Sequence, residues 1–333
     1  MATIKFKRNY LVKRLILVGI LFLTSNGVSA QNLFPNKPLK IIVPFAPGGA
    51  SDAVARPIAQ ALTAILGQPV LVENKPGAAG NIALDFAARA PADGYTLLMG
   101  NISTNSMNQT SYAHLLKVVP SRDLTAVGMV AISPSVLVSS TVFAPKNAQE
   151  FVAYAKANPS KINYWLPGIA SGPHFDMLRM EKTVGITMTA VPFSGGAGPG
   201  LTSLIGGQVD IGLINVGGAL AQVRAGKLRA LAVSTAQRLP DLPDVPTAAE
   251  ANLGALTSSW QALFVPTATP VALIQTLHVA LNEALAKPEV KEAIAKTYSR
   301  ITPSKSPQEA QEYIVGQTQY WARVITDLGV KAE

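Results

Sequence analysis

Short apolar runs rich in β-branched residues alternate along the chain with longer segments of helical periodicity. The pattern predicts strands at 39–44, 70–73, 95–99, 126–130, 135–139, 161–165, 189–192, 209–213 and 228–233. It predicts helices at 51–66, 81–90, 270–286 and 307–328. This alternation is typical of a parallel sheet with helices on both faces. A chain of 333 residues is long enough for two such domains.

Clusters of glycine and proline interrupt this pattern. Clusters at 44–49, 76–80, 167–173 and 192–200 mark the turns that lead from a strand into a helix. Pro57 falls inside the first predicted helix, where it has no amide hydrogen to donate, so we expect a late helix start or a kink there.

The first 30 residues resemble a secretory signal peptide. Five basic residues precede a short apolar run at 15–23, and small residues follow at 28–30. The apolar run is too short to span about 30 Å of hydrocarbon, which disfavours the alternative of a membrane anchor. We therefore expect cleavage after Ala30 and an exported protein. The basic residues of this leader are Lys5, Lys7, Arg8, Lys13 and Arg14.

Charge and cysteine content narrow the class of protein. The expected leader carries five basic and no acidic residues, so the 28 basic and 19 acidic residues of the chain leave a net charge of +4 without it. That small charge, with no lysine- or arginine-rich run, disfavours a nucleic-acid partner. There is no cysteine, so neither a disulfide nor a cysteine-ligated metal is expected.

Motifs for catalysis and cofactor binding are missing. The three histidines, at 114, 174 and 278, are scattered, and neither an HExxH helix nor a G-x-S-x-G elbow occurs. The loop at 47–52 lacks the Gly-Lys-Ser/Thr of a phosphate-binding loop. The glycine run at 195–200 does not match the dinucleotide fingerprint, because its glycines are misplaced and Pro199 removes an amide donor. We therefore predict no catalytic residue, no cofactor and no metal.

The glycine-rich turns favour binding instead. A turn between strand and helix presents free backbone N–H groups and the positive end of a helix dipole, which can hold an anion without a cationic side chain. A single turn of this kind can equally be no more than a tight connection.

Several segments together identify a family. Residues 39–56 read LKIIVPFAPGGASDAVAR, 73–82 read ENKPGAAGNI and 93–98 read DGYTLL. The pattern continues through 67–70, 191–193, 206–210, 224–233, 242–247 and 258–260. The chain resembles the Bug family throughout this length. Bug proteins are the periplasmic solute-binding proteins of tripartite tricarboxylate transporters.

The resemblance implies an α/β fold of the type II periplasmic binding class. Two lobes are joined by two crossing segments, and a ligand lies in the cleft between them. We expect lobe one to comprise 33–132 and 251–333, and lobe two 133–250. Hinge closure around the ligand follows from this architecture.

The resemblance also implies that the turn after the first strand grips a ligand carboxylate, and the residues it assigns to this grip are Phe45, Ala46, Gly48, Gly49 and Ser51. Asp52 lies near the helix start and has an alternative role as a helix cap. Arg56 is expected to be a structural or solvated charge. In the second turn Asn101, Ser103 and Thr104 are candidate donors, with capping of the next helix as the alternative.

The second predicted lobe departs from the family pattern. Trp165, Leu166 and Ile169 replace small or polar residues, and Ser194 replaces a lysine beside a lengthened glycine run. We hypothesise a ligand with one captured carboxylate and an apolar or aromatic body, because apolar walls pair with apolar ligand surface. The alternative places these three apolar side chains in the lobe core. The remaining candidate ligand contacts are Ser171, His174, Gly195 and Asn215. For His174 the alternative is a structural role at the start of a helix.

These observations predict a periplasmic solute-binding protein rather than an enzyme. It would act as a monomer that captures a small organic carboxylate and delivers it to integral-membrane permease subunits. The same fold would also serve a ligand sensor that presents its bound form to a membrane signalling kinase. An exported hydrolase is disfavoured by the missing catalytic triad.

Overall fold

The computed structural model describes residues 34–193 and 197–330. The predicted signal peptide and its cleavage site lie outside these residues. Both sheets of the fold belong to one compact unit that begins at Lys37. None of the described helices combines the length and the apolar character needed to cross a membrane.

The first sheet has the strand order β11-β4-β10-β3-β1-β2. Its strands are β1 (Leu39–Val43), β2 (Val70–Asn74), β3 (Thr96–Asn101), β4 (Leu124–Ser133), β10 (Ser259–Pro266) and β11 (Arg300–Ile301). Strand β1 pairs in parallel with β2 and β3, whereas β10 runs antiparallel to both β3 and β4. The predicted parallel arrangement is therefore confirmed for β1, β2 and β3 but wrong for β10 and β11, which run antiparallel to their neighbours.

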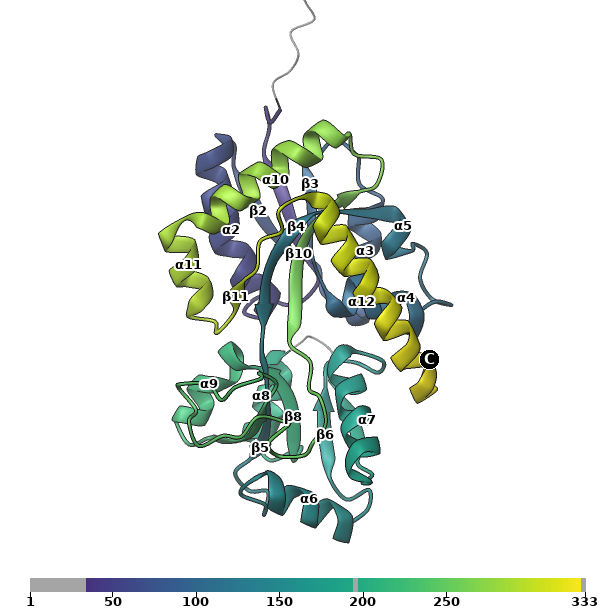
Figure 1. Ribbon diagram of the computed structural model, residues 1–333, viewed down its shortest axis with the longest axis vertical. Coiled ribbons are helices and arrows are strands. Elements are labelled where there is room, and N and C mark those ends of the chain that lie inside the picture. Colours follow the sequence, from purple (N-terminus) through teal and green to yellow (C-terminus); the bar gives the residue numbers. More distant parts are fainter. Residues whose placement is uncertain (1–33, 194–196, 331–333) are drawn as a thin grey trace, which may run out of the picture. The chain divides into compact units, whose positions relative to one another are not determined.

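The second sheet has the strand order β7-β6-β8-β5-β9. Its strands are β5 (Ser135–Ser140), β6 (Asn163–Leu166), β7 (Thr189–Pro192), β8 (Ile211–Asn215) and β9 (Leu228–Val233). Strand β6 is parallel to β7 and β8, and β5 is antiparallel to β8 and β9. Only Pro134 separates β4 from β5, so one extended stretch joins the two sheets, as Figure 1 shows.

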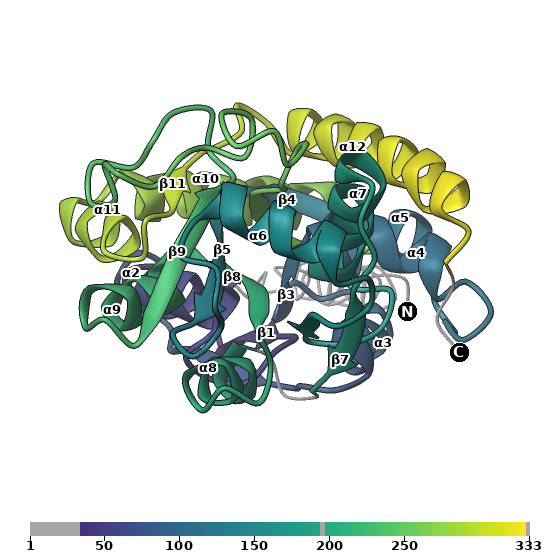
Figure 2. The ribbon, with the colours of Figure 1, turned by 90° about the horizontal axis from the view of Figure 1, so that it is seen from below.

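Helices cover both sheets (Figures 1 and 2). On the first sheet they are α2 (Ala50–Leu66), α3 (Asn81–Ala88), α4 (Asn108–Ser111), α5 (Pro120–Asp123), α10 (Val271–Ala286), α11 (Pro288–Ala295) and α12 (Pro307–Leu328). On the second sheet they are α6 (Ala148–Ala157), α7 (Gly172–Val184), α8 (Ala197–Ile205) and α9 (Val216–Arg224). Two short helical segments, η1 (Ala78–Gly80) and η2 (Ser103–Met107), lie on the side of the first sheet.

The second sheet divides its side chains between two cores. In β6, Tyr164 and Leu166 pack with the helices α6 and α7, while Trp165 packs with α8 and α9. Strand β5 repeats the pattern, since Leu137 joins the first core and Val136 the second. This is the period of two that a pleated strand imposes. A sheet with helices on both faces therefore favours apolar residues on both sides of its strands.

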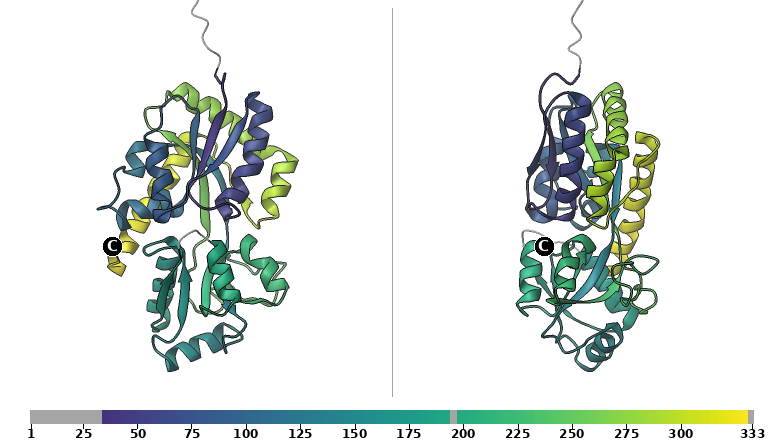
Figure 3. Two further views of the ribbon diagram at one scale, coloured as in Figure 1. Left: turned by 180° about the vertical axis from the view of Figure 1, so that it is seen from behind. Right: turned by 90° about the vertical axis from the view of Figure 1, so that its left-hand side faces the viewer.

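Helix α2 runs unbroken through Pro57 and begins at Ala50, one residue earlier than the sequence suggested. The expected late start was wrong. The views in Figure 3 show α2 and α10 side by side against the first sheet, and both α10 and α11 contact α2. These contacts explain how the helix continues past a residue that cannot donate its backbone hydrogen bond.

Candidate functional site

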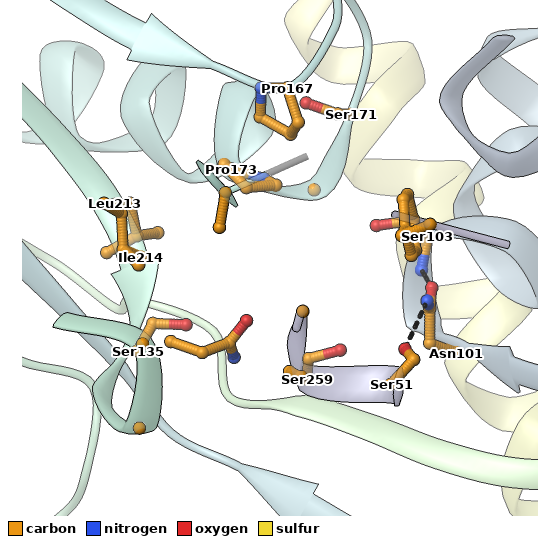
Figure 4. Close-up of a pocket in the computed structure, with 18 of the residues that line it drawn as sticks. Ser51, Asn101, Ser103, Ser135, Pro167, Ser171, Pro173, Leu213, Ile214 and Ser259 are labelled. Atoms are coloured by element: carbon orange, nitrogen blue, oxygen red, sulfur yellow. Dashed lines mark hydrogen bonds between the residues drawn. The ribbon is translucent and has the colours of Figure 1, made fainter. Parts of the chain in front are cut away.

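A cavity of about 730 Å³ lies between the two sheets (Figure 4). That volume is within the usual range for small-molecule sites. From the side of the first sheet it is lined by residues 45–51, 53, 79, 101–103, 107, 259, 261, 296 and 297. From the side of the second sheet it is lined by residues 135, 165, 167, 171–173, 176, 197–199, 201, 213–215, 217, 218 and 257.

Four helices, α2, α7, α8 and α9, have residues of their first turn in the cavity wall. The residues that precede α2, α7 and α9 are Gly49, Ser171 and Asn215, and none of them caps its helix through a side-chain hydrogen bond. The first N–H groups of a helix have no acceptor within it, and the helix dipole adds positive potential there. The cavity therefore receives hydrogen-bond donors from both sheets.

A hydrogen-bond network around the buried Asp52 holds the turn between β1 and α2. Asp52 accepts from the backbone N–H of Gly48 (Oδ2, 3.0 Å) and from Arg56 (Nε to Oδ2 and Nη2 to Oδ1, both 2.8 Å). Asn74 Nδ2 donates to Asp52 Oδ1 at 3.0 Å and to the carbonyl of Phe45 at 2.9 Å. Burial opposes ionisation, yet these hydrogen bonds hold the pKa of Asp52 below its usual value. Neither Asp52 nor Arg56 lines the cavity, so the network supports the turn from behind.

The turn itself faces the cavity. Phe45, Ala46, Gly48, Gly49 and Ser51 all line it. Gly48 has a φ of +82°, a conformation that glycine adopts without strain. The residues predicted to grip a carboxylate are therefore brought together in one part of the cavity wall.

The turn after β3 contributes Asn101 and Ser103, which line the cavity near Ser51 (Figure 4). Asn101 Oδ1 accepts from the backbone N–H groups of Ser103 (2.9 Å) and Thr104 (3.1 Å). Thr104 is fully buried, donates to Asn105 Oδ1 at 2.6 Å and does not line the cavity. Of the three predicted donors, Asn101 and Ser103 therefore lie in the cavity wall, whereas Thr104 holds the turn.

Trp165 belongs both to the cavity wall and to a core. It lines the cavity, and its indole lies so close to α8 that a Cβ atom on Gly200 would be 2.1 Å from Cε2. Its Nε1 has no partner among the described residues. Leu166 is fully buried in the core on the opposite face, and Ile169 packs against two cores without lining the cavity. Of these three apolar side chains, one reaches the cavity.

The start of α7 contains two further predicted residues. Ser171 lines the cavity, and its buried hydroxyl has no partner in the described part of the chain. His174 does not line the cavity. Its Nδ1 accepts the backbone N–H of Ala170 at 2.9 Å, and burial lowers the pKa of His174 to about 4. His174 therefore holds the preceding loop as a neutral side chain.

Asn215, at the start of α9, lines the cavity as well. Ser194 and Gly195 lie outside the described residues. No group of three metal-ligating side chains occurs among the residues that the structure describes.

Sequence reasoning missed several polar residues of the wall. Ser259 and Gln261 lie on β10, which was not predicted, and Ser135 lies where β4 passes into β5. Asp176 accepts from the backbone N–H (3.0 Å) and hydroxyl (2.7 Å) of Thr257, and burial raises the pKa of Asp176 to about 6. No local motif marks these positions, because Ser135, Ser259 and Gln261 reach the cavity through the pairing of distant strands, and Asp176 meets Thr257 only in the folded chain.

Two helix-covered sheets that enclose a cavity lined by helix N-termini define the class of two-lobed periplasmic binding proteins. Within this class the chain belongs to the tripartite tricarboxylate transporter family receptors, whose family model matches residues 54–330. This confirms the family identified from the sequence.

Individual relatives agree with the assignment. The chain is 33% identical to Protein BugT of Bordetella pertussis strain Tohama I, over 96% of this chain and 98% of the relative. The solved structure of R. palustris Rpa4515 with adipate has 29% identity and a TM-score of 0.84, covering 90% of this chain and 100% of that one. MatC from Rhodopseudomonas palustris with bound malate has 31% identity and a TM-score of 0.81, covering 88% and 100%. These family members and structural neighbours are binding proteins.

Proposed function

We propose that the protein captures an organic carboxylate in the periplasm and delivers it to integral-membrane permease subunits. It acts as a monomer, without catalysis and without a cofactor. The observation that carries this proposal is the set of uncapped helix N-termini around the cavity. Such termini bind carboxylates through backbone N–H groups. Membership of the transporter receptor family supports the delivery step.

The proposed lobes follow the two sheets. Lobe one comprises 33–132 and 251–333, lobe two comprises 133–250, and the ligand lies between them. Support comes from the strand composition of the sheets, since β5 to β9 all fall between Ser135 and Val233. An exported protein with a cleaved leader is consistent with the periplasmic class of its relatives.

The ligand that this cavity favours has one carboxylate at the start of α2 and an apolar body. Apolar side chains form much of the remaining wall: Ile102, Met107, Trp165, Pro167, Pro173, Pro199, Leu201, Leu213 and Ile214. Burial of apolar surface contributes roughly 25 cal/mol per Å². Adipate and malate, bound by two structural neighbours, show the size of acid with which a search can begin.

A thermal-shift screen of the protein purified from the periplasm of a producing cell tests this proposal. The panel contains citrate, malate, adipate, octanoate and benzoate, with calorimetry for every acid that shifts the melting temperature. A ligand at 100 times its Kd adds about 2.7 kcal/mol, which raises the melting temperature by a few degrees. Shifts with adipate, octanoate or benzoate but not citrate are expected. Shifts with citrate or malate alone would contradict the apolar body, and no shift with any acid would contradict carboxylate binding.

A further inference from the structure

The indole of Trp165 fills the space between the second sheet and α8. Trp165 and Gly212 are direct partners on the parallel strands β6 and β8. A Cβ atom on Gly212 would lie 3.4 Å from Cε3 of the indole, and one on Gly200 of α8 would lie 2.1 Å from Cε2. The indole therefore lies against one strand residue and one helix residue that both lack a side chain.

This packing holds the indole in place. Trp165 is 2% exposed and belongs to a core that includes Leu204 and Val209. Side chains in such cores are close-packed and occupy defined rotamers. A ligand that presses on the indole would therefore have to displace α8 or this core.

Trp165 lies on the side of the cavity that faces the turn between β1 and α2. Ile214 is two residues beyond Gly212 on β8, so it projects from the same face of the sheet as Trp165, and both belong to one core. Figure 4 shows Ile214 across the cavity from Ser51 and Asn101. A ligand whose carboxylate lies at the start of α2 therefore extends its other end towards the wall that contains Trp165.

We propose that Trp165 is a specificity residue that limits the length of the apolar body that the cavity accepts. The inference rests on the carboxylate-binding function proposed above. Each methylene group that becomes fully buried in the wall raises the affinity by about fourfold. Once the ligand reaches the indole, a further methylene group overpacks a core that cannot yield, and the affinity falls. The wild type therefore has one chain length that it binds best.

The first test measures this chain length in matched variants. The probes are the straight-chain monocarboxylates from hexanoate to dodecanoate, titrated by calorimetry. Trp165→Ala opens the space of the indole, and Trp165→Leu is the milder change. Leu166→Ala is the matched control, because Leu166 is fully buried in the core on the opposite face and does not line the cavity. Both alanine variants lose a large buried side chain, but only Trp165→Ala enlarges the cavity.

For the wild type we expect affinity to rise with chain length and then to fall by about tenfold or more beyond the best length. The best length should increase by about two or more carbon atoms in Trp165→Ala, by less in Trp165→Leu and not at all in Leu166→Ala. A wild-type affinity that never falls up to dodecanoate, or an equal increase in Leu166→Ala, would overturn the inference while leaving carboxylate binding intact. If no acid of the series binds the wild type, the proposed apolar body fails first, and this inference fails with it.

A second measurement leaves the core filled. Trp165 lines the cavity, whereas Trp260 and Trp321 do not, and bromine quenches the fluorescence of an indole that it touches. At saturation, 8-bromooctanoate should quench the wild type more strongly than 2-bromooctanoate, whose bromine lies beside the carboxylate. Trp165→Phe should remove this difference. Equal quenching of the wild type by the two acids would show that the far end of the ligand lies away from Trp165, which contradicts the inference.

Discussion

His174 is a buried histidine that makes a structural contact and does not line the cavity. Its Nδ1 accepts the N–H of Ala170, which fixes the loop ahead of α7, and its pKa is lowered to about 4. The unfolded chain would protonate the same side chain near pH 6.5. The folded protein therefore loses stability from His174 as the pH falls from about 6.5 towards 4.

We expect His174→Asn to reduce this acid sensitivity, because an asparagine oxygen can accept the same N–H without titrating. The wild type should lose about 3 kcal/mol through His174 between pH 7 and pH 4, and the variant should not. Denaturant unfolding at several pH values measures the difference. Parallel pH profiles for the two proteins would contradict the assignment.

Asp176 changes the pH dependence of folding stability in the direction opposite to His174. Because burial raises its pKa to about 6, its neutral form favours the fold, and its contribution is lost as the pH rises from about 4 through 6. In the wild type it therefore offsets part of the acid loss from His174. We expect Asp176→Asn to show a steeper loss of stability below pH 6 than the wild type, measured by the same unfolding experiment. A shallower loss would show that Asp176 does not titrate as described.

At the scale of the element, the position of Trp165 depends on glycine in α8. The helix approaches the indole so closely that Gly200 has no room for a side chain, whereas Gly198, two residues earlier, has nothing within 4 Å of the place of a Cβ. The position of the Trp165 indole in the cavity wall therefore depends on how closely α8 packs against it.

We expect Gly200→Ala to destabilise the protein by about 1–3 kcal/mol, because the helix or the indole must move. The apolar acids of the panel should bind more weakly to this variant. Gly198→Ala is the matched control and should be neutral or slightly stabilising, since alanine favours a helix over glycine. Melting curves measure the effect, and equal melting temperatures for the two variants would contradict the packing argument.

The elements also show what sequence could and could not predict. Alternation of short apolar runs with helical periods was enough for most strands, because each run carries its own pattern. Strand β10 reads SWQALFVP and is buried from Trp260 to Pro266, so it has no alternation to mark it and follows a long irregular segment. The candidate residues at 45–51 could be placed because they follow a clear strand. Gln261 and Ser135 could not, since their position depends on pairing between distant strands.

At the scale of the whole unit, contacts between residues of the two proposed lobes flank the cavity. Tyr298, with a φ of +60°, packs against the core of the second sheet and donates its hydroxyl to Asp241 Oδ2 at 2.6 Å. A Cβ atom on Gly217 would be 2.5 Å from the carbonyl of the neighbouring Thr297. Separately, the hydroxyl of Tyr112 donates to the carbonyl of Ile169 at 2.5 Å.

We expect the Tyr298→Phe variant to release the acid of the panel that binds most tightly several-fold faster than the wild type, because one hydrogen bond between the two proposed lobes is lost. Tyr320→Phe, on the exposed face of α12, is the control. Stopped-flow displacement measures the release rates. Equal rates for the wild type and Tyr298→Phe would show that this contact does not limit opening.

The uncapped helix N-termini around the cavity have one more consequence, which concerns how binding depends on salt concentration. Among the described residues of the wall, Lys296 is the one cation; it is largely exposed and lies 2.8 Å from Glu292. Charges in solution are screened by salt, with a Debye length of about 8 Å at 0.15 M, whereas buried interactions are screened far less. A carboxylate held by backbone and amide dipoles should therefore bind with nearly the same affinity at low and at high salt concentration. Binding that depended on exposed lysines would weaken as the salt concentration rises.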